Sequence, residues 1–138
     1  MTLYVDTSCL LRLLLREPGA LEVLRSAERL VSSELLAVEG RRTIDRLRLM
    51  GSLTQDETAD RLGAFGEWLE AIDLVLLRQP VLTRAAEPLP VPLGTLDALH
   101  LATALTWRDR TGESLVVSTH DAALGSAARV FGFEVLGS

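Results

Sequence analysis

Short apolar runs alternate with longer segments of helical periodicity along most of the chain. Apolar, β-branched and aromatic residues predict five strands, at residues 2–5, 30–31, 72–77, 114–118 and 133–136. Between them, apolar residues recur at the three- and four-residue spacing of amphipathic helices. The helices predicted in this way cover residues 7–16, 20–27, 34–49, 55–71, 79–86, 96–109 and 121–129. This alternation predicts a three-layer α/β/α fold with a mostly parallel five-stranded sheet, built by a single domain over residues 1–138.

Local capping signals mark where two central helices begin. Ser32 and Ser33 offer N-caps for the helix that runs to about residue 49. Thr54 and Glu57 have the spacing of a capping box, which begins the next helix. Residues 33–71 are therefore expected to form a helical hairpin that projects from the sheet.

The chain is acidic, and its basic residues are all of one kind. It is 48% hydrophobic and has a net charge of −5, which argues against general adhesion to nucleic acid. All fourteen basic residues are arginine, a side chain suited to planar, bidentate contacts with phosphate or carboxylate. Arg41, Arg42, Arg46 and Arg48 form a basic run, read either as a solvated helix face or as a contact for phosphate or an acidic partner.

Nothing in the sequence signals a membrane or an oxidising compartment. No apolar stretch approaches the roughly 20 residues of a membrane span. The beginning of the chain lacks the basic and apolar segments of a secretion signal. The single cysteine, Cys9, has no partner for an internal disulfide and is predicted to be a buried free thiol. These features favour a cytoplasmic protein without a membrane partner.

Two carboxylates follow predicted strands directly. Asp6 ends the first strand, and Asp121 comes shortly after the fourth. Taken singly, each suits the N-cap of the following helix. In parallel sheets, however, ligands bind outside the carboxyl ends of the strands, where both residues are expected to lie.

Two further carboxylates lie on apolar helices. Asp97 is in the first turn of the helix over 96–109, which Thr95 is expected to cap. The helix dipole explains that position but not its apolar surroundings. Glu39 shares the inward face of the leucines one turn before it, whereas Glu34 is explained by the helix dipole, so Glu39 is the preferred functional acid.

Four carboxylates that converge on one cleft repel one another unless a cation lies between them. Oxygen ligands alone favour Mg²⁺ or Mn²⁺ over zinc. A divalent cation of this kind supports hydrolysis of phosphodiesters, because it polarises the phosphate and activates a water. The carboxylates therefore predict a metal-dependent nuclease chemistry.

Four blocks of the sequence resemble the successive signature blocks of PIN-domain proteins, and more narrowly of VapC-type toxins from toxin–antitoxin pairs. They read "LYVDTSCLLRLLL", "VSSELLAVEGRR", "LGTLDALHLATAL" and "VVSTHDAALGSAARVFGFEVL". The resemblance implies a Mg²⁺- or Mn²⁺-dependent endoribonuclease with the catalytic acids Asp6, Glu39, Asp97 and Asp121. It implies that Asp6, Asp97 and Asp121 hold the metal, with Glu39 binding directly or through water, and that Ser8 and Thr119 line the pocket.

The same resemblance implies partners. The substrate would be single-stranded or loop RNA, and a cognate VapB-type antitoxin would pack on the toxin and reach the acidic cleft. Family members commonly form homodimers. The helical region over 33–71 is expected to contribute to both protein contacts.

Two other classes of protein compete with this interpretation. Phosphoacceptor receivers and haloacid-type phosphotransferases also gather aspartates at strand ends, but both ordinarily need a lysine, and this chain has none. A PIN fold that only binds is the non-enzymatic alternative, against which the four acids argue. Four remaining residues have simpler expectations: His100 is predicted to be a core histidine with a hydrogen bond, His120 to lie at the cleft, and Trp68 and Trp107 to be core or interface residues.

Overall fold

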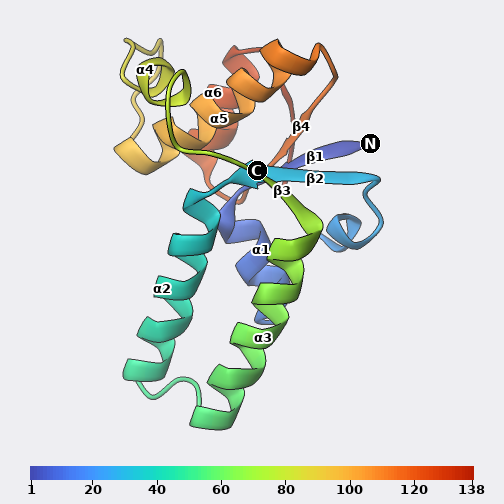
Figure 1. Cartoon of the computed structure of the whole chain (residues 1–138), viewed down its shortest axis with the longest axis vertical. Helices are drawn as coiled ribbons and strands as arrows, with labels where there is room; N and C mark the ends of the chain where they lie inside the picture. The colour runs from blue at the N-terminus through green and yellow to red at the C-terminus, as the bar shows by residue number, and fades with distance from the viewer.

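The computed structural model describes all 138 residues and places a five-stranded sheet between two layers of helices (Figure 1). The strands are β1 (Thr2–Val5), β2 (Arg29–Ser33), β3 (Ile72–Val75), β4 (Val116–Ser118) and β5 (Glu134–Leu136). Their order in the sheet is β3-β2-β1-β4-β5, and every neighbouring pair is parallel. The predicted α/β class is confirmed, and the sheet is entirely rather than mostly parallel.

Six α-helices and one 3₁₀ turn connect the strands. They are α1 (Thr7–Leu14), the 3₁₀ turn η1 (Glu22–Arg25), α2 (Leu35–Leu49), α3 (Gln55–Ala71), α4 (Val81–Ala85), α5 (Thr95–Thr111) and α6 (Ala122–Val130). The helix predicted over residues 20–27 is wrong, because only η1 forms there. Within this turn only Leu24 is fully buried, and Ser26 follows its last residue.

Alternation along β1 sends its side chains to two different helical layers. Leu3 and Val5 are buried in a core with α1, α2 and α3, whereas Tyr4 is buried in a second core with α5 and α6. Figure 1 shows the two layers on opposite sides of the sheet. The central strand is therefore covered on both faces, as expected for a parallel sheet.

Helices α2 and α3 form a hairpin that extends away from the sheet (Figure 1). Thr54 and Glu57 form the predicted capping box at the start of α3, each side chain bonding the other's backbone N–H. The two helices approach closely at Gly40, where a Cβ atom would lie only 2.1 Å from Cζ of the buried Phe65 ring. Only glycine fits at this position without displacing the ring.

The predicted caps of α5 and α2 are found only in part, and the N-cap position of α2 is Glu34, whose side chain makes no capping bond. Gly94, in extended conformation, is the N-cap of α5, so Thr95 is the first helical residue and not the cap. At the start of α2, Ser33 Oγ accepts a bond from the backbone N–H of Leu35 (3.1 Å). Ser32 does not cap this helix, because its hydroxyl donates to a strand carbonyl instead.

Single residues away from the sheet edge behave largely as their patterns predict. Cys9 is a free and fully buried thiol, and burial followed by the charge of Asp6 raises its pKa to about 12. Trp107 is buried in the core and Trp68 is partly buried beside α1. None of the helices combines the length and the apolar character that crossing a membrane requires.

Candidate functional site

Asp6 lies where the strand order of the sheet reverses, between β1 and β4. It occupies the N-cap position of α1, yet its side chain makes no capping bond. Instead Oδ2 accepts hydrogen bonds from Ser8 Oγ (2.8 Å) and Thr119 Oγ1 (2.7 Å), and the residue is only 6% exposed. Such a reversal point is where open α/β sheets bind their ligands.

Two buried serines hold the end of β1 from both sides. Ser32 Oγ on β2 donates to the carbonyl of Val5, and Ser118 Oγ on β4 donates to the carbonyl of Tyr4, each at 2.6 Å. The backbone N–H of Asp6 in turn donates to the carbonyl of Ser118 (3.0 Å). These bonds satisfy buried backbone groups and position Asp6 at the carboxyl edge of the sheet.

Glu39 reaches the same edge from α2. Its Oε1 accepts from Thr7 Oγ1 (2.7 Å) and lies 2.7 Å from His100 Nε2. Burial alone would raise the pKa of this half-buried carboxyl, but the bonds from His100 and Thr7 outweigh it and lower the pKa. Glu34, the rejected alternative, accepts instead from the backbone N–H of Leu77 (2.8 Å), just beyond β3.

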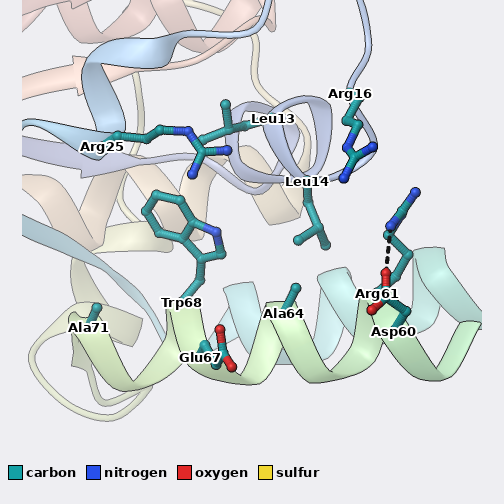
Figure 2. A pocket seen from close by; sticks show the side chains of 10 residues that line it. All are labelled: Leu13, Leu14, Arg16, Arg25, Asp60, Arg61, Ala64, Glu67, Trp68 and Ala71. Atoms are coloured by element: carbon teal, nitrogen blue, oxygen red, sulfur yellow. Dashed lines mark hydrogen bonds and ion pairs between the residues drawn. The ribbon is translucent and has the colours of Figure 1, made fainter. Parts of the chain in front are cut away.

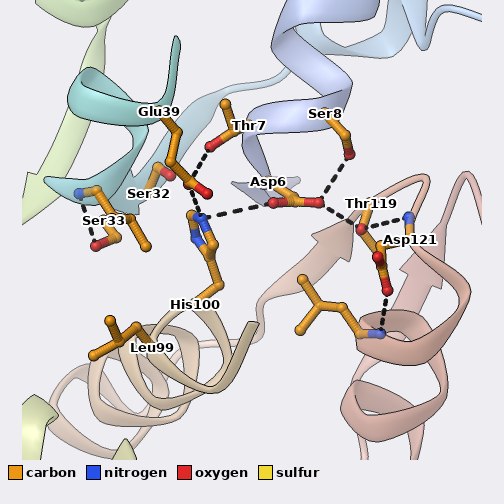
Figure 3. Close-up of polar contacts among 12 residues, drawn as sticks. Asp6, Thr7, Ser8, Ser32, Ser33, Glu39, Leu99, His100, Thr119 and Asp121 are labelled. Atoms are coloured by element: carbon orange, nitrogen blue, oxygen red, sulfur yellow. Dashed lines mark hydrogen bonds and ion pairs between the residues drawn. The ribbon is translucent and has the colours of Figure 1, made fainter. Parts of the chain in front are cut away.

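His100 joins the acids of β1 and α2, as Figure 3 shows. The residue is 1% exposed, with Nδ1 2.7 Å from the hydroxyl of Tyr4 and Nε2 3.7 Å from Oδ1 of Asp6. It is therefore the buried, hydrogen-bonded histidine that the sequence predicts. Its partner is Glu39, however, so it belongs to the candidate site and not only to the core.

The other two acids are less enclosed. Asp97 lies in the first turn of α5, and burial raises its pKa, with the negative charges of Asp121 and then Asp6 adding to the effect. Asp121 is the N-cap of α6, where Oδ1 accepts from the backbone N–H of Leu124 (2.8 Å). Its own backbone N–H donates to Thr119 Oγ1 (3.0 Å). The capping interpretation thus holds for Asp121 but not for Asp6.

The four acids converge on one edge, but they do not form a ready-made metal cage. No three carboxylate, imidazole or thiol groups surround a common point as the ligands of one ion. The donors nevertheless suit a hard cation in kind, since all are carboxylate oxygens. Asp6 takes both of its hydroxyl bonds on Oδ2, and Glu39 takes both of its bonds on Oε1. Oδ1 of Asp6 and Oε2 of Glu39 take part in none of these hydrogen bonds.

His120 adjoins the site through its backbone, whereas the basic run of α2 makes its own ion pairs. The backbone N–H of His120 donates to Ser8 Oγ (3.3 Å), whereas its ring Nδ1 lies 3.2 Å from the carbonyl oxygen of Gly137. In the basic run of α2, Arg42 and Arg48 pair with Asp45 (3.2 and 2.9 Å). Both arginines are exposed, as a solvated helix face requires.

Sequence reasoning did not place Thr7 or Tyr4 in the site. Thr7 directly follows Asp6, and Tyr4 lies two residues before it on β1, so proximity in sequence to a candidate acid was the available signal. His100 comes one turn after Asp97 on the same side of α5, which also pointed toward the site. A search for polar side chains near each acid would have found all three.

Comparison with known proteins agrees with this geometry. A family model described as the PIN domain matches residues 3–130. The chain is 33% identical to Ribonuclease VapC46 of Mycobacterium tuberculosis over 138 residues, which cover 97% of this chain and 95% of that protein. It is also 33% identical to Ribonuclease VapC47 of Mycobacterium tuberculosis, with 95% and 93% covered.

Proposed function

Because the chain belongs to the PIN-domain family, in its VapC branch, we propose that it is a cytoplasmic endoribonuclease toxin dependent on Mg²⁺ or Mn²⁺. Its substrate would be single-stranded or loop RNA. The observation that carries the proposal is the meeting of Asp6, Glu39, Asp97 and Asp121 at one edge of the sheet. The relatives named as ribonucleases support the same activity.

In this proposal Asp6, Asp97 and Asp121 hold the cation, and Glu39 binds it directly or through water. When bound, the cation would polarise the phosphate of the RNA and activate a water for attack. The carboxylates also exclude RNA from the edge unless their charge is compensated, so cation binding and RNA binding are coupled.

The hydroxyl groups of the chain orient these acids. Ser8 and Thr119 both donate to Oδ2 of Asp6, which turns Oδ1 toward Glu39 and His100. Thr7 does the same for Glu39 by donating to Oε1. In Asp6 and Glu39 one oxygen therefore takes the hydroxyl bonds, and the other oxygen would be the ligand of the cation.

The direct test is RNA cleavage by the purified chain with Mg²⁺ or Mn²⁺, with a chelator, and with Asp97→Asn. We expect cleavage only in the presence of the cation and a strong loss in the variant. Intact RNA under every metal condition would refute the nuclease and favour a PIN fold that only binds. Cleavage unaffected by Asp97→Asn would refute the site.

The antitoxin contact is proposed on the hairpin, in a hollow of about 430 Å³ between α1 and α3 (Figure 2). Leu14 and Trp68 give it apolar walls, and Arg16, Arg25 and Arg61 surround them. Nε of Arg61 is buried and has no hydrogen-bond partner. Asp60 and Glu67 also line the hollow, and Nη1 of Arg61 lies 2.9 Å from Oδ2 of Asp60. The three arginines outnumber these two acids, so the lining suits an antitoxin segment that carries apolar side chains and carboxylates.

The antitoxin contact is tested by charge reversal on either side of the hairpin. Arg61→Glu in the hollow should weaken binding of the cognate VapB-type antitoxin at least tenfold. Arg46→Glu on the exposed face of α2 is the matched control and should bind normally. Expression of the chain alone should be toxic, and expression with the antitoxin should restore growth. Equal loss of binding in the two variants would place the antitoxin elsewhere.

Self-association is the last part of the proposal, and we place it on α4 and α5 in place of the helical region over 33–71 that the sequence suggested. A largely apolar hollow of about 550 Å³ lies between α4, the proline-rich loop after it and the start of α5. Leu82 and Leu96 on these two helices are exposed at 41% and 51%. A second copy of the chain would cover them. Light scattering should give the mass of a dimer, and Leu82→Glu with Leu96→Glu should give a monomer; a wild-type monomer would refute this part.

A further inference from the structure

We propose that Tyr4 and His100 form a buried clamp that positions Glu39 for cation binding. The proposal rests on the proposed nuclease function and adds to it a pair of positioning residues. Neither is a ligand of the cation in this scheme. Tyr4 acts on His100, and His100 acts on Glu39, across three elements of the fold: β1, α5 and α2.

In the proposed clamp Tyr4 donates a hydrogen bond to His100, and His100 donates one to Glu39. A carboxylate only accepts, so the imidazole proton of His100 lies on Nε2, which donates to Glu39 Oε1 at 2.7 Å. In the proposed tautomer Nδ1 accepts, and the hydroxyl of Tyr4 donates to it across the 2.7 Å contact. Burial, followed by the charge of Asp6, raises the pKa of Tyr4, so that its hydroxyl keeps the proton it donates.

Tyr4 is a rigid support for the ring of His100. The residue is 1% exposed, and its backbone carbonyl accepts a hydrogen bond from Ser118 Oγ on the neighbouring strand. The two rings pack edge to face, with centroids 5.9 Å apart and planes at 78°. Since both nitrogens of His100 are engaged and the residue is 1% exposed, the imidazole has one orientation in which to hold Glu39.

The orientation of the clamp matters because His100 lies between two acids. Nε2 is 2.7 Å from Glu39 and 3.7 Å from Asp6, so a single N–H group faces both carboxylates (Figure 3). This N–H group offsets the repulsion between the two carboxylates. It binds Oε1 of Glu39, so that Oε2 is left without a hydrogen bond to the protein. Outer partners of this kind ordinarily change metal affinity or activity by about 10–100-fold when they are lost.

Two amide variants separate positioning from packing. His100→Gln places an amide nitrogen at the same number of bonds from Cβ as Nε2, so it can still donate to Glu39. His100→Asn reaches only as far as Nδ1 and loses that bond. We expect His100→Asn to weaken Mn²⁺ binding, measured by calorimetry, about tenfold or more, and His100→Gln to recover most of it. Thr106→Val, buried on the same helix, is the control for packing.

A second set of measurements does not depend on cleavage. Nitrogen-15 NMR of His100 at neutral pH should show the proton on Nε2, and Tyr4→Phe should shift the Nδ1 resonance. Combining His100→Asn with Glu39→Gln should weaken Mn²⁺ binding no further than Glu39→Gln alone, because the clamp acts through that residue. A proton on Nδ1, or additive losses in the double variant, would overturn the clamp.

The failures of the two proposals are distinguishable. Wild-type protein that neither binds Mn²⁺ nor cleaves RNA would refute the proposed function, and the clamp with it. Wild-type protein that does both, while His100→Asn matches it, would overturn the clamp alone. Equal losses in His100→Asn and His100→Gln would likewise overturn the clamp, since packing would then explain them. Circular dichroism of each variant confirms that it is folded.

Discussion

The four acids of the site fall into two pairs that differ in their surroundings. The inner pair, Asp6 and Glu39, is held by side-chain donors: two hydroxyls on Asp6, and one hydroxyl and an imidazole on Glu39. The outer pair, Asp97 and Asp121, lies at the first turn of α5 and the N-cap of α6, and the side-chain bond of Asp121 comes from the backbone. The protein therefore stabilises two of its acids with its own side chains and leaves the others nearer to solvent.

The pKa directions follow this difference. Burial would raise the pKa of Glu39, but its donors lower it, so this carboxyl is charged without any cation. Burial and the neighbouring charges of Asp121 and Asp6 raise the pKa of Asp97. The inner pair is thus organised by the fold, whereas Asp97 carries repulsion that a cation would relieve. Substitutions in the two pairs should therefore differ in their effects on RNA cleavage, cation binding and stability.

Loss of an inner acid should have the largest effect. Asp6→Asn removes a proposed cation ligand and the charged acceptor for Ser8 and Thr119, so RNA cleavage should fall more than about a hundredfold. Asp109→Asn, an exposed acid near the other end of α5, is the control and should cleave normally. Cleavage by Asp6→Asn within threefold of wild type would show that the inner pair is dispensable.

Cation binding should stabilise the wild type more than a variant of the outer pair. At about 100 times its dissociation constant, Mn²⁺ should add about 2.7 kcal/mol to the free energy of unfolding. In a domain of this size that raises the melting temperature by roughly 5–10 °C. Thermal melts with Mn²⁺ and with chelator should show a smaller rise for Asp97→Asn. An equal rise in both proteins would mean that Asp97 does not hold the cation.

Without a cation, Asp97→Asn should be more stable than the wild type at neutral pH. Since the folded-state pKa of Asp97 is raised, its charged form destabilises the fold above that pKa. The penalty is lost as the pH falls through the raised value, and it is absent below the unfolded value of about 3.9. The gain at pH 7 should be at most about 1 kcal/mol, because the group is partly exposed. Urea unfolding at pH 7 and near pH 3 measures it; a gain that persists in acid would contradict this origin.

Among the changes in RNA cleavage, the smallest is expected when one hydroxyl that binds the inner pair is removed. Thr7→Val removes one bond to Glu39 and should lower the free energy of unfolding by about 0.5–1.5 kcal/mol, with a severalfold loss of cleavage. Thr58→Val removes a similar bond, from a buried threonine to the carbonyl of Thr54, far along the hairpin. It should cost similar stability and leave cleavage unchanged. If both variants cleave alike, Thr7 only supports the fold.

Regular patterns in the sequence were enough to predict the layers of the fold. The apolar run Leu3, Tyr4 and Val5 and the capping box at Thr54 are local signals, and the strand and helix start that they predict are found in the structure. The helix over 20–27 was wrong because tertiary packing, which periodicity does not report, decides whether so short a segment is helical.

The side-chain contacts within the site could not be predicted from local sequence patterns. That Asp6 and Asp121 follow strands predicted their common edge, and the structure places them there. The bond between Tyr4 and His100 joins residues 96 positions apart and depends on how α5 packs across β1. Neither spacing nor propensity determines that packing, so the histidine was predicted to be buried but its partners were not.

The contact between Gly40 and Phe65 limits how this part of the chain can vary. Gly40 directly follows Glu39, so the close contact between α2 and the Phe65 ring lies in the same turn of α2 as an acid of the site. Any side chain at position 40 would have to displace the Phe65 ring or shift α2, which carries Glu39. A mutational scan should therefore find position 40 as intolerant as the acids themselves, although glycine has no chemistry to contribute. Two adjacent positions of α2 are therefore constrained for different reasons: position 39 by its charge, and position 40 by the lack of room for a side chain.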